Sequence, residues 1–160
     1  MSVCRVIGVG HTGITVSDID RSISFYRDVL GFEVGTKMRV GGEMFEKVTG
    51  VPGAEIDIAF VRAHGHFFEL LSYAKPEDRA ASKLRACDPG FMDVSFKVEN
   101  LDDVVASIKT HGFEPLSPIQ TVPEGPEKGL RVIYARDPDG VVLEFMEEPR
   151  GVILEHLHGP

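Results

Sequence analysis

Residues 11–32 read HTGITVSDIDRSISFYRDVLGF, and this stretch decides how the chain folds. It begins with a run typical of a buried strand, continues through a helix-starting pattern with an apolar stripe, and ends at a glycine. A second copy of the unit begins at Asp93, with strand, cap, helix and glycine in the same order. A repeated unit predicts a fold with internal pseudo-symmetry, and such folds often place a shared site between their units.

Aligning the two copies pairs polar residues as well as apolar ones. The alignment sets residues 14–16 (ITV) over residues 96–98 (FKV). The same offset places His11 opposite Asp93, at the start of each copy's first strand. We therefore treat these two side chains as equivalent candidates for a site.

The last strand of each copy carries a glutamate. Residues 65–69 (GHFFE) overlie residues 140–144 (GVVLE), so Glu69 and Glu144 hold the same place in their copies. Each glutamate has large apolar neighbours, and a strand residue in such a setting can simply point outwards, because strand residues alternate between faces. That interpretation explains one such glutamate. It explains less well why both copies carry one at the same distance from a glycine turn.

Composition and charge exclude several classes of protein. A length of 160 residues suits one compact domain, or two small modules that share a core. The net charge of −8, without a cluster of Lys and Arg, argues against nucleic-acid binding. No stretch approaches the roughly 18 apolar residues of a membrane span, and MSVCRVIGVG at the start lacks a signal-peptide pattern. Two cysteines, Cys4 and Cys87, predict free thiols and a cytoplasmic location.

Periodicity predicts a β-α-β-β-β order for the first module, residues 6–73. The expected elements are a strand at 6–16, a helix capped by Ser17 with Asp20 and ending at Leu30, strands at 32–40, 55–61 and 66–73, and a long connection at 41–53. In the strand at 55–61, alternation puts Asp57 on one face and Ile56 and Ile58 on the other. Residues 74–90 are polar, with two prolines, and predict a linker.

The second module, residues 91–147, repeats this order. Its expected elements are a strand at 91–98, a helix capped by Asn100 and ending near His111, and strands at 113–119, 130–135 and 141–147, the last two joined by the turn DPDG at 137–140. The prediction is thus a single domain at 1–150 made of two modules. A C-terminal tail at 149–160 has no counterpart in the repeat.

These motifs resemble the vicinal oxygen chelate superfamily, also called the glyoxalase/bleomycin-resistance/dioxygenase fold. The resemblance rests on GHTGITVSDIDRSISFYRDVLGF at 10–32, FKVENLDD at 96–103 and RDPDGVVLEF at 136–145, and it covers about residues 6–147. It implies an α+β fold in which two βαβββ modules form an open, U-shaped barrel around a divalent metal ion.

The resemblance also implies the metal ligands, one from the first and one from the last strand of each module. Carried over by position, they are His11, Glu69, Asp93 and Glu144. The family most often has His where this chain has Asp93. One imidazole with three carboxylates makes a hard, anionic site that suits Mn, Fe, Co or Ni and is less typical of Zn. The alternative is that metal binding has weakened or been lost, with Asp93 a surface residue at a strand start.

The ligand pattern favours one reaction class. A fourth ligand at Glu69 is the feature of glyoxalase I and methylmalonyl-CoA epimerase, which stabilise an enediolate and move a proton with a carboxylate. We therefore predict a metal-dependent isomerase, epimerase or lyase that abstracts a proton next to a carbonyl of a small-molecule substrate, in a homodimer. The alternatives are an Fe(II) ring-cleaving dioxygenase, although the second His of its ligand set is missing, and a metal-free drug-binding resistance protein.

Proton abstraction needs a base, and two carboxylates are candidates. Asp57 lies in the third strand, where epimerases similar to this chain carry a catalytic Glu; the alternative is a solvated strand residue. Glu144 is the second candidate, if it leaves the metal to serve as the base. Candidates for an apolar pocket lining, or for plain core, are Met44, Phe45, Met92 and Tyr134.

Overall fold

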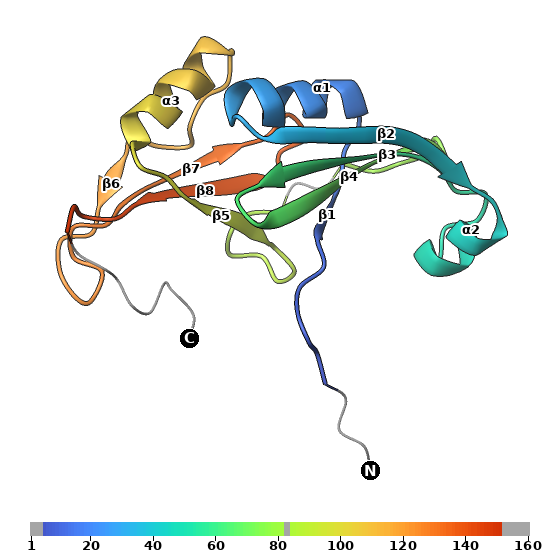
Figure 1. Ribbon diagram of the computed structural model, residues 1–160, viewed down its shortest axis with the longest axis horizontal. Helices are drawn as coiled ribbons and strands as arrows, with labels where there is room; N and C mark the ends of the chain where they lie inside the picture. Colours follow the sequence, from blue (N-terminus) through green and yellow to red (C-terminus); the bar gives the residue numbers. More distant parts are fainter. Residues whose placement is uncertain (1–4, 82–83, 152–160) are drawn as a thin grey trace. The chain divides into compact units, whose positions relative to one another are not determined.

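The computed structural model describes residues 5–81 and 84–151. The chain divides into two compact units, Met1–Arg79 and Ala80–Pro160, and each contains one four-stranded sheet (Figure 1). Cys4 and most of the predicted tail, residues 152–160, lie outside the described residues, whereas Cys87 is a free, exposed thiol. Within the described ranges, no helix has the length and apolar character that a membrane crossing requires.

The first unit contains the predicted elements and one additional helix. Its elements are β1 (Thr12–Thr15), α1 (Ile19–Ser24), the π-helical segment η1 (Phe25–Val29), β2 (Glu33–Gly41), α2 (Glu43–Thr49), β3 (Glu55–Ala63) and β4 (His66–Lys75). The strand order is β1-β4-β3-β2. β1 runs parallel to β4, and the remaining neighbours are antiparallel.

The first helix begins one residue later than predicted. Asp18, not Ser17, is its N-cap, and the Asp18 carboxylate accepts hydrogen bonds from the backbone N–H groups of Asp20 and Arg21, both at 3.0 Å. These bonds satisfy donors that the first helical turn leaves without a backbone acceptor. The helical segment ends before Gly31, whose φ of +72° lies in the region that favours glycine.

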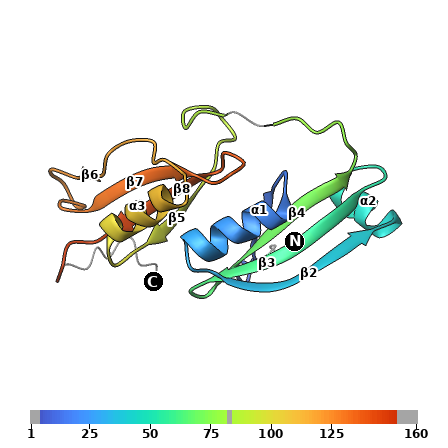
Figure 2. The same ribbon diagram turned by 90° about the horizontal axis from the view of Figure 1, so that it is seen from above.

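The first sheet is apolar on both faces. α1 and η1 lie over one face (Figures 1 and 2), and the buried side chains there are Ile19, Ile23, Tyr26, Ala59, Val61, Phe68 and Leu70. The opposite face carries a second cluster, in which the buried residues are Ala54, Ile56 and Ile58 and the partly buried ones are Val40, Val51, Phe60, Leu71 and Tyr73. Because both faces bury apolar residues, hydrophobic alternation alone does not identify the face that carries a site.

Two segments of the first unit differ from the prediction. The strand expected at 6–16 is shortened to β1, and residues 5–10 are exposed and form no regular structure. The connection expected at 41–53 contains α2, with Gly42 and Gly50 at its ends. No residue of α2 is buried, although Met44, Phe45 and Val48 stand at helical spacing in its sequence.

The second unit repeats the topology of the first. Its elements are β5 (Asp93–Lys97), α3 (Leu101–Thr110), β6 (Gln120–Thr121), β7 (Arg131–Arg136) and β8 (Val142–Glu147). The strand order is β5-β8-β7-β6, with β5 parallel to β8. The strand predicted at 113–119 is wrong. One bridge between Pro115 and Ala135 and the short β6 stand in its place, because Pro115 and Pro118 have no N–H to donate to a ladder.

Helix α3 is capped as the sequence predicts. The Asn100 side chain accepts hydrogen bonds from the N–H groups of Asp102 and Asp103, at 3.1 and 3.3 Å. α3 lies over one face of the second sheet (Figure 2), and the buried residues between them are Leu101, Ile108, Ile133, Leu143 and Phe145. Two modules of the same β-α-β-β-β topology, with α2 inserted in the first, give the predicted α+β fold class.

Candidate functional site

The first module brings its two predicted ligands together. Gly13 of β1 is paired with Glu69 of β4, so His11, two residues before Gly13, lies on the same side of the sheet as Glu69. Nε2 of His11 lies 3.1 Å from Oε2 of Glu69. The His11 side chain is 47% exposed and the Glu69 side chain 18%, so the pair can be reached from solvent through the imidazole.

An aromatic ring completes this arrangement. Phe60 of β3 is directly opposite Glu69 in the antiparallel ladder, and its ring meets the His11 ring edge-on, with 5.9 Å between centroids and 83° between planes. Edge-on contact limits the orientations that the imidazole can adopt. Sequence reasoning did not assign Phe60 to the site, although its place opposite the candidate ligand Glu69 follows from pairing the last two strands of the module.

In the second module, Asp93 and Glu144 share one face of the sheet. Ser95 of β5 is paired with Glu144 of β8, and Asp93 lies two residues before Ser95 on the same strand, hence on the same side. Tyr134 of β7 is directly opposite Glu144. The pKa of the Tyr134 hydroxyl is raised by burial, by the charges of Glu144 and Asp93, and by a hydrogen bond with Glu144. Three polar side chains therefore meet on this face.

Tyr134 is the functional candidate that the sequence identified least well. It was one of four residues predicted to line an apolar pocket or to be core. Its position in the β7–β8 ladder is that of Phe60 in the β3–β4 ladder, each opposite the glutamate of the last strand. Of the other three, Met44 and Met92 are exposed and Phe45 is half-buried. The offset that aligns Glu69 with Glu144 sets Phe60 over Ala135, so the repeat alignment alone does not identify Tyr134.

The two pairs, His11 with Glu69 and Asp93 with Glu144, consist of side chains that bind divalent ions, and the spacing of the first pair also suits such an ion. Donor atoms bonded to one ion at about 2.0–2.2 Å lie about 3 Å apart when they meet at a right angle. The 3.1 Å between His11 Nε2 and Glu69 Oε2 agrees with that value. Among the residues that the structure describes, no group of three or more His, Cys, Asp or Glu side chains is gathered closely enough to hold a metal ion.

The structure places Asp57 on the face of the first sheet away from Glu69. Asp57 is paired with Ser72, which is three residues from Glu69 along β4, so the two carboxylates lie on opposite faces. Ile56 and Ile58, predicted to face away from the site, share the Glu69 face. The predicted alternation is therefore confirmed, but the two isoleucines, and not Asp57, share the face of the candidate ligand Glu69.

The surroundings of Asp57 also differ from those of a poised base. Arg39 of β2 donates two hydrogen bonds to its carboxylate oxygens, from Nε at 2.8 Å and from a terminal nitrogen at 2.7 Å. These bonds, together with the Arg39 charge, hold the pKa of Asp57 below its ordinary value against the opposing effect of burial. A weakly basic carboxylate on the far face is poorly placed for proton abstraction. The role of Asp57 as the base stays a prediction that this placement counts against.

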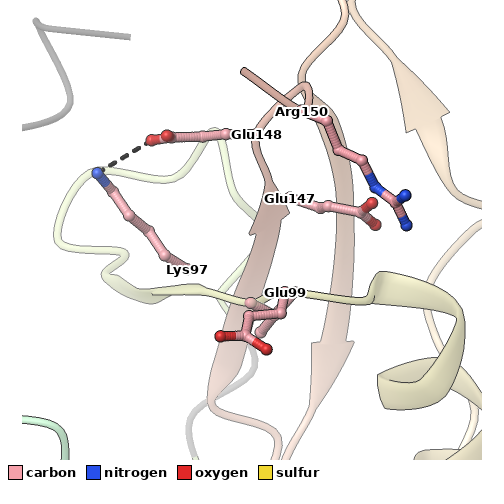
Figure 3. Close-up of a pocket in the computed structure, with 6 residues that line it drawn as sticks. Lys97, Glu99, Glu147, Glu148 and Arg150 are labelled. Carbon is pink, nitrogen blue, oxygen red and sulfur yellow. Dashed lines mark ion pairs between the residues drawn. The ribbon is translucent and has the colours of Figure 1, made fainter. Parts of the chain in front are cut away.

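A depression of about 300 Å³ lies in the second unit, beyond the carboxyl ends of β5 and β8 (Figure 3). Its lining residues are Lys97, Val98, Glu99, Glu147, Glu148 and Arg150. The Lys97 ammonium lies 3.1 Å from Glu148, and Glu147 accepts hydrogen bonds from Arg131 and from the backbone N–H of Leu101 at the start of α3. These carboxylates serve the packing of the module, and none of the predicted ligands lines the depression.

The comparisons with known proteins agree with this architecture. Residues 8–145 match the Glyoxalase/Bleomycin resistance protein/Dioxygenase superfamily. The 2-epi-5-epi-valiolone epimerase of an Actinomyces species is 28% identical over 145 residues, which are 88% of this chain and 79% of that protein. A glyoxalase family protein from Bacillus cereus has a crystal structure similar at a TM-score of 0.79, with 26% identity over 92% of this chain and 98% of that one.

A third similar structure is the trypanothione-dependent glyoxalase I of Leishmania major. It has a TM-score of 0.59 and 26% identity, and the match covers 86% of this chain and 84% of that one. The superfamily match extends from the residues before β1 into β8 and so includes both modules. The chain therefore belongs to the Glyoxalase/Bleomycin resistance protein/Dioxygenase superfamily.

Proposed function

We propose that the protein is a metal-dependent isomerase or epimerase that abstracts a proton next to a carbonyl group of a small-molecule substrate. The observation that carries the proposal is the equivalence of the two ligand pairs. Each pair is placed at the first and last strand of its module, on one face of one sheet. Epimerases and glyoxalase I enzymes occur in the superfamily, and the curated relative from Actinomyces is named as an epimerase.

We assign the ion to His11, Glu69, Asp93 and Glu144. One imidazole nitrogen and three carboxylates form a ligand set that suits Mn, Fe, Co or Ni, and Zn less often. When bound, a divalent ion of this kind polarises the substrate carbonyl and stabilises the negative charge that develops on its oxygen.

Glu144 is the carboxylate that we assign to proton transfer. It takes the proton from the carbon next to the carbonyl and returns a proton to that carbon or its neighbour, so the substrate is rearranged without a change of oxidation state. Glu69 is in contact with the His11 imidazole instead. Asp57 points to the other face of its sheet and is bound to Arg39.

The surroundings of the first pair favour a substrate that has an apolar part. Glu69 shares its sheet face with Phe60, Ile58 and Leu71, which belong to the apolar cluster of that face. Apolar side chains beside a charged pair keep water away and strengthen its electrostatic interactions. A ring or carbon chain attached to the reacting carbonyl would lie against these residues.

The proposal includes the assembly and partners of the protein. We propose a cytoplasmic homodimer that binds a small molecule and neither nucleic acid nor membrane. The net charge of −8 supports the exclusion of nucleic acid, because phosphate contacts require clustered cations. Light scattering on the purified protein measures the assembly, and a mass of one chain would refute the dimer.

Metal content and proton exchange together test the proposed function. The purified protein is stripped of metal, reconstituted with Mn, Co, Ni, Fe(II) or Zn, and analysed for bound ion. We expect near-stoichiometric uptake, lost in His11→Ala and in Glu144→Ala. The matched controls are His111→Ala and Glu43→Ala, which remove an exposed imidazole and an exposed carboxylate from outside the ligand set.

The reconstituted protein is then incubated with carbonyl compounds in deuterated water, and mass spectrometry measures wash-in of deuterium next to the carbonyl. Exchange that depends on metal and on Glu144 supports the proposal. Oxygen uptake with a catechol in the Fe(II) form, without exchange on any substrate, would replace it by a ring-cleaving dioxygenase. A wild type that binds no ion would favour the drug-binding alternative.

A further inference from the structure

The two modules place different residues opposite their equivalent glutamates. In the first module Phe60 faces Glu69 across the β3–β4 ladder, and in the second Tyr134 faces Glu144 across the β7–β8 ladder. Residues directly opposite in an antiparallel pair are neighbours on one face, with Cβ atoms about 4.5–5.5 Å apart. Each aromatic ring therefore stands beside its glutamate, and the two positions differ in composition by one hydroxyl group.

That hydroxyl group changes what the neighbouring glutamate can do. Phe60 has no hydrogen-bonding group, so the partner of Glu69 is the His11 imidazole, 3.1 Å away. Tyr134 instead carries a hydroxyl group directly across the ladder from Glu144, where it can donate a hydrogen bond to the carboxylate. A carboxylate has about four lone-pair positions on its two oxygens. One donor fixes the rotation of the group and leaves the remaining positions for other partners.

The second carboxylate of the module lies on the same face of the sheet. Asp93 is on the Glu144 face, and its negative charge acts on Tyr134. The phenol of Tyr134 is half-buried on this face, directly across the ladder from Glu144.

We infer that Tyr134 is a positioning residue, which orients the Glu144 carboxylate through its hydroxyl and so makes Glu144 inequivalent to Glu69. The inference rests on the proposed function, because it assigns Glu144 to a metal ion. Groups that hydrogen-bond to a ligand orient it towards the ion, and their removal typically lowers metal affinity about 10–100-fold. The first module, with Phe60 at this place, relies on the contact between His11 and Glu69.

The variant Tyr134→Phe reproduces the first module's arrangement and removes only the hydroxyl group. The matched control is Tyr73→Phe, because Tyr73 lies in the apolar cluster of the first sheet and also loses only a hydroxyl. Full-length wild type, Tyr134→Phe and Tyr73→Phe are titrated with Mn(II) and with Co(II). Calorimetry gives the affinity, and the visible absorption of Co(II) reports its ligand geometry. Urea unfolding of the metal-free proteins is measured in parallel.

We expect Tyr134→Phe to bind Mn(II) about 10–100-fold more weakly than wild type, with an altered Co(II) spectrum and an unchanged unfolding midpoint. Tyr73→Phe should match wild type in affinity and spectrum. Equal affinities and spectra in the two variants would overturn the inference while leaving the proposed function in place. Weaker binding together with a lowered metal-free midpoint would also overturn it, because Tyr134 would then be a packing residue. A wild type that binds neither ion would overturn both proposals.

Discussion

Replacing Asp57 by Asn tests whether the face of the sheet decides which carboxylate moves the proton. The variant keeps the size of the side chain and removes its charge, and so weakens the two hydrogen bonds from Arg39. Because Asp57 lies on the face away from Glu69, we expect metal-dependent deuterium exchange to fall less than about tenfold, a change in activation free energy below about 1.4 kcal/mol. Glu144→Gln removes the assigned proton carrier, and we expect a loss of about 10²–10⁴-fold.

The stability of the Asp57 variant should also change little. The Arg39 side chain is 61% exposed and the Asp57 side chain 19%, so solvent screens much of their attraction. Exposed pairs of this kind contribute little, and for a chain of this length we expect the unfolding midpoint to fall by no more than about 4 °C. Exchange rates are compared at equal metal occupancy, measured by elemental analysis. A loss of about 10² or more in Asp57→Asn with metal retained would refute the placement argument and restore Asp57 as the base.

Two further predictions concern the folding of the modules. Leu143→Ala should lower the free energy of unfolding by about 2–5 kcal/mol, since Leu143 is fully buried. The control is Met44→Ala, which truncates an exposed side chain and should change the free energy of unfolding by less than about 0.5 kcal/mol. Equal urea midpoints for the two variants would contradict this prediction. Asp18→Ala should cost about 1 kcal/mol near neutral pH. Hydrogen bonds from the backbone N–H groups of Arg21 and Asp20 lower the pKa of Asp18. The difference in unfolding free energy between wild type and Asp18→Ala should therefore persist above about pH 4 and vanish as the pH falls through the lowered pKa. A difference that stays constant in acid would contradict this prediction.

The sequence was most informative where one residue type has one structural use. Asn100 was predicted as a helix cap and is one, and Gly31 was predicted to end the first helix and follows its last turn. The strands β3 and β4 begin at the predicted residues, because runs of that length with alternating apolar residues are typical of strands and not of helices. Errors arose where two good candidates were adjacent, as with Ser17 and Asp18 at the start of α1.

Other features depend on contacts that no local pattern records. α2 is a short helix between Gly42 and Gly50 that buries none of its residues, so packing against a core does not define it. Alternation could not tell which face of β3 carries the candidate ligands, because Ile56 and Ile58 on one face and Ala59 and Val61 on the other are all buried. The absence of the strand at 113–119, by contrast, was predictable from its prolines.

Of the candidate site, the repeat alignment identified two pairs, and the structure shows each pair on a single sheet face. The same alignment did not extend to Phe60 and Tyr134, because the third strands share no identical residue at that place. Their importance depends on which strands are neighbours. That information comes from hydrogen-bonded register and not from composition.

The edge strands β2 and β6 of the two sheets differ in length, and this has a consequence for how the protein avoids aggregation. β2 is a nine-residue edge strand with an unpaired side that could extend another molecule's sheet. It carries Lys37 and Arg39 among its exposed residues, and charges on an edge oppose such pairing. β6 is an edge of only two residues, and the segment before it contains Pro115 and Pro118. At the β2 and β6 edges, therefore, one module protects a long strand with charge, whereas the other presents a strand of only two residues.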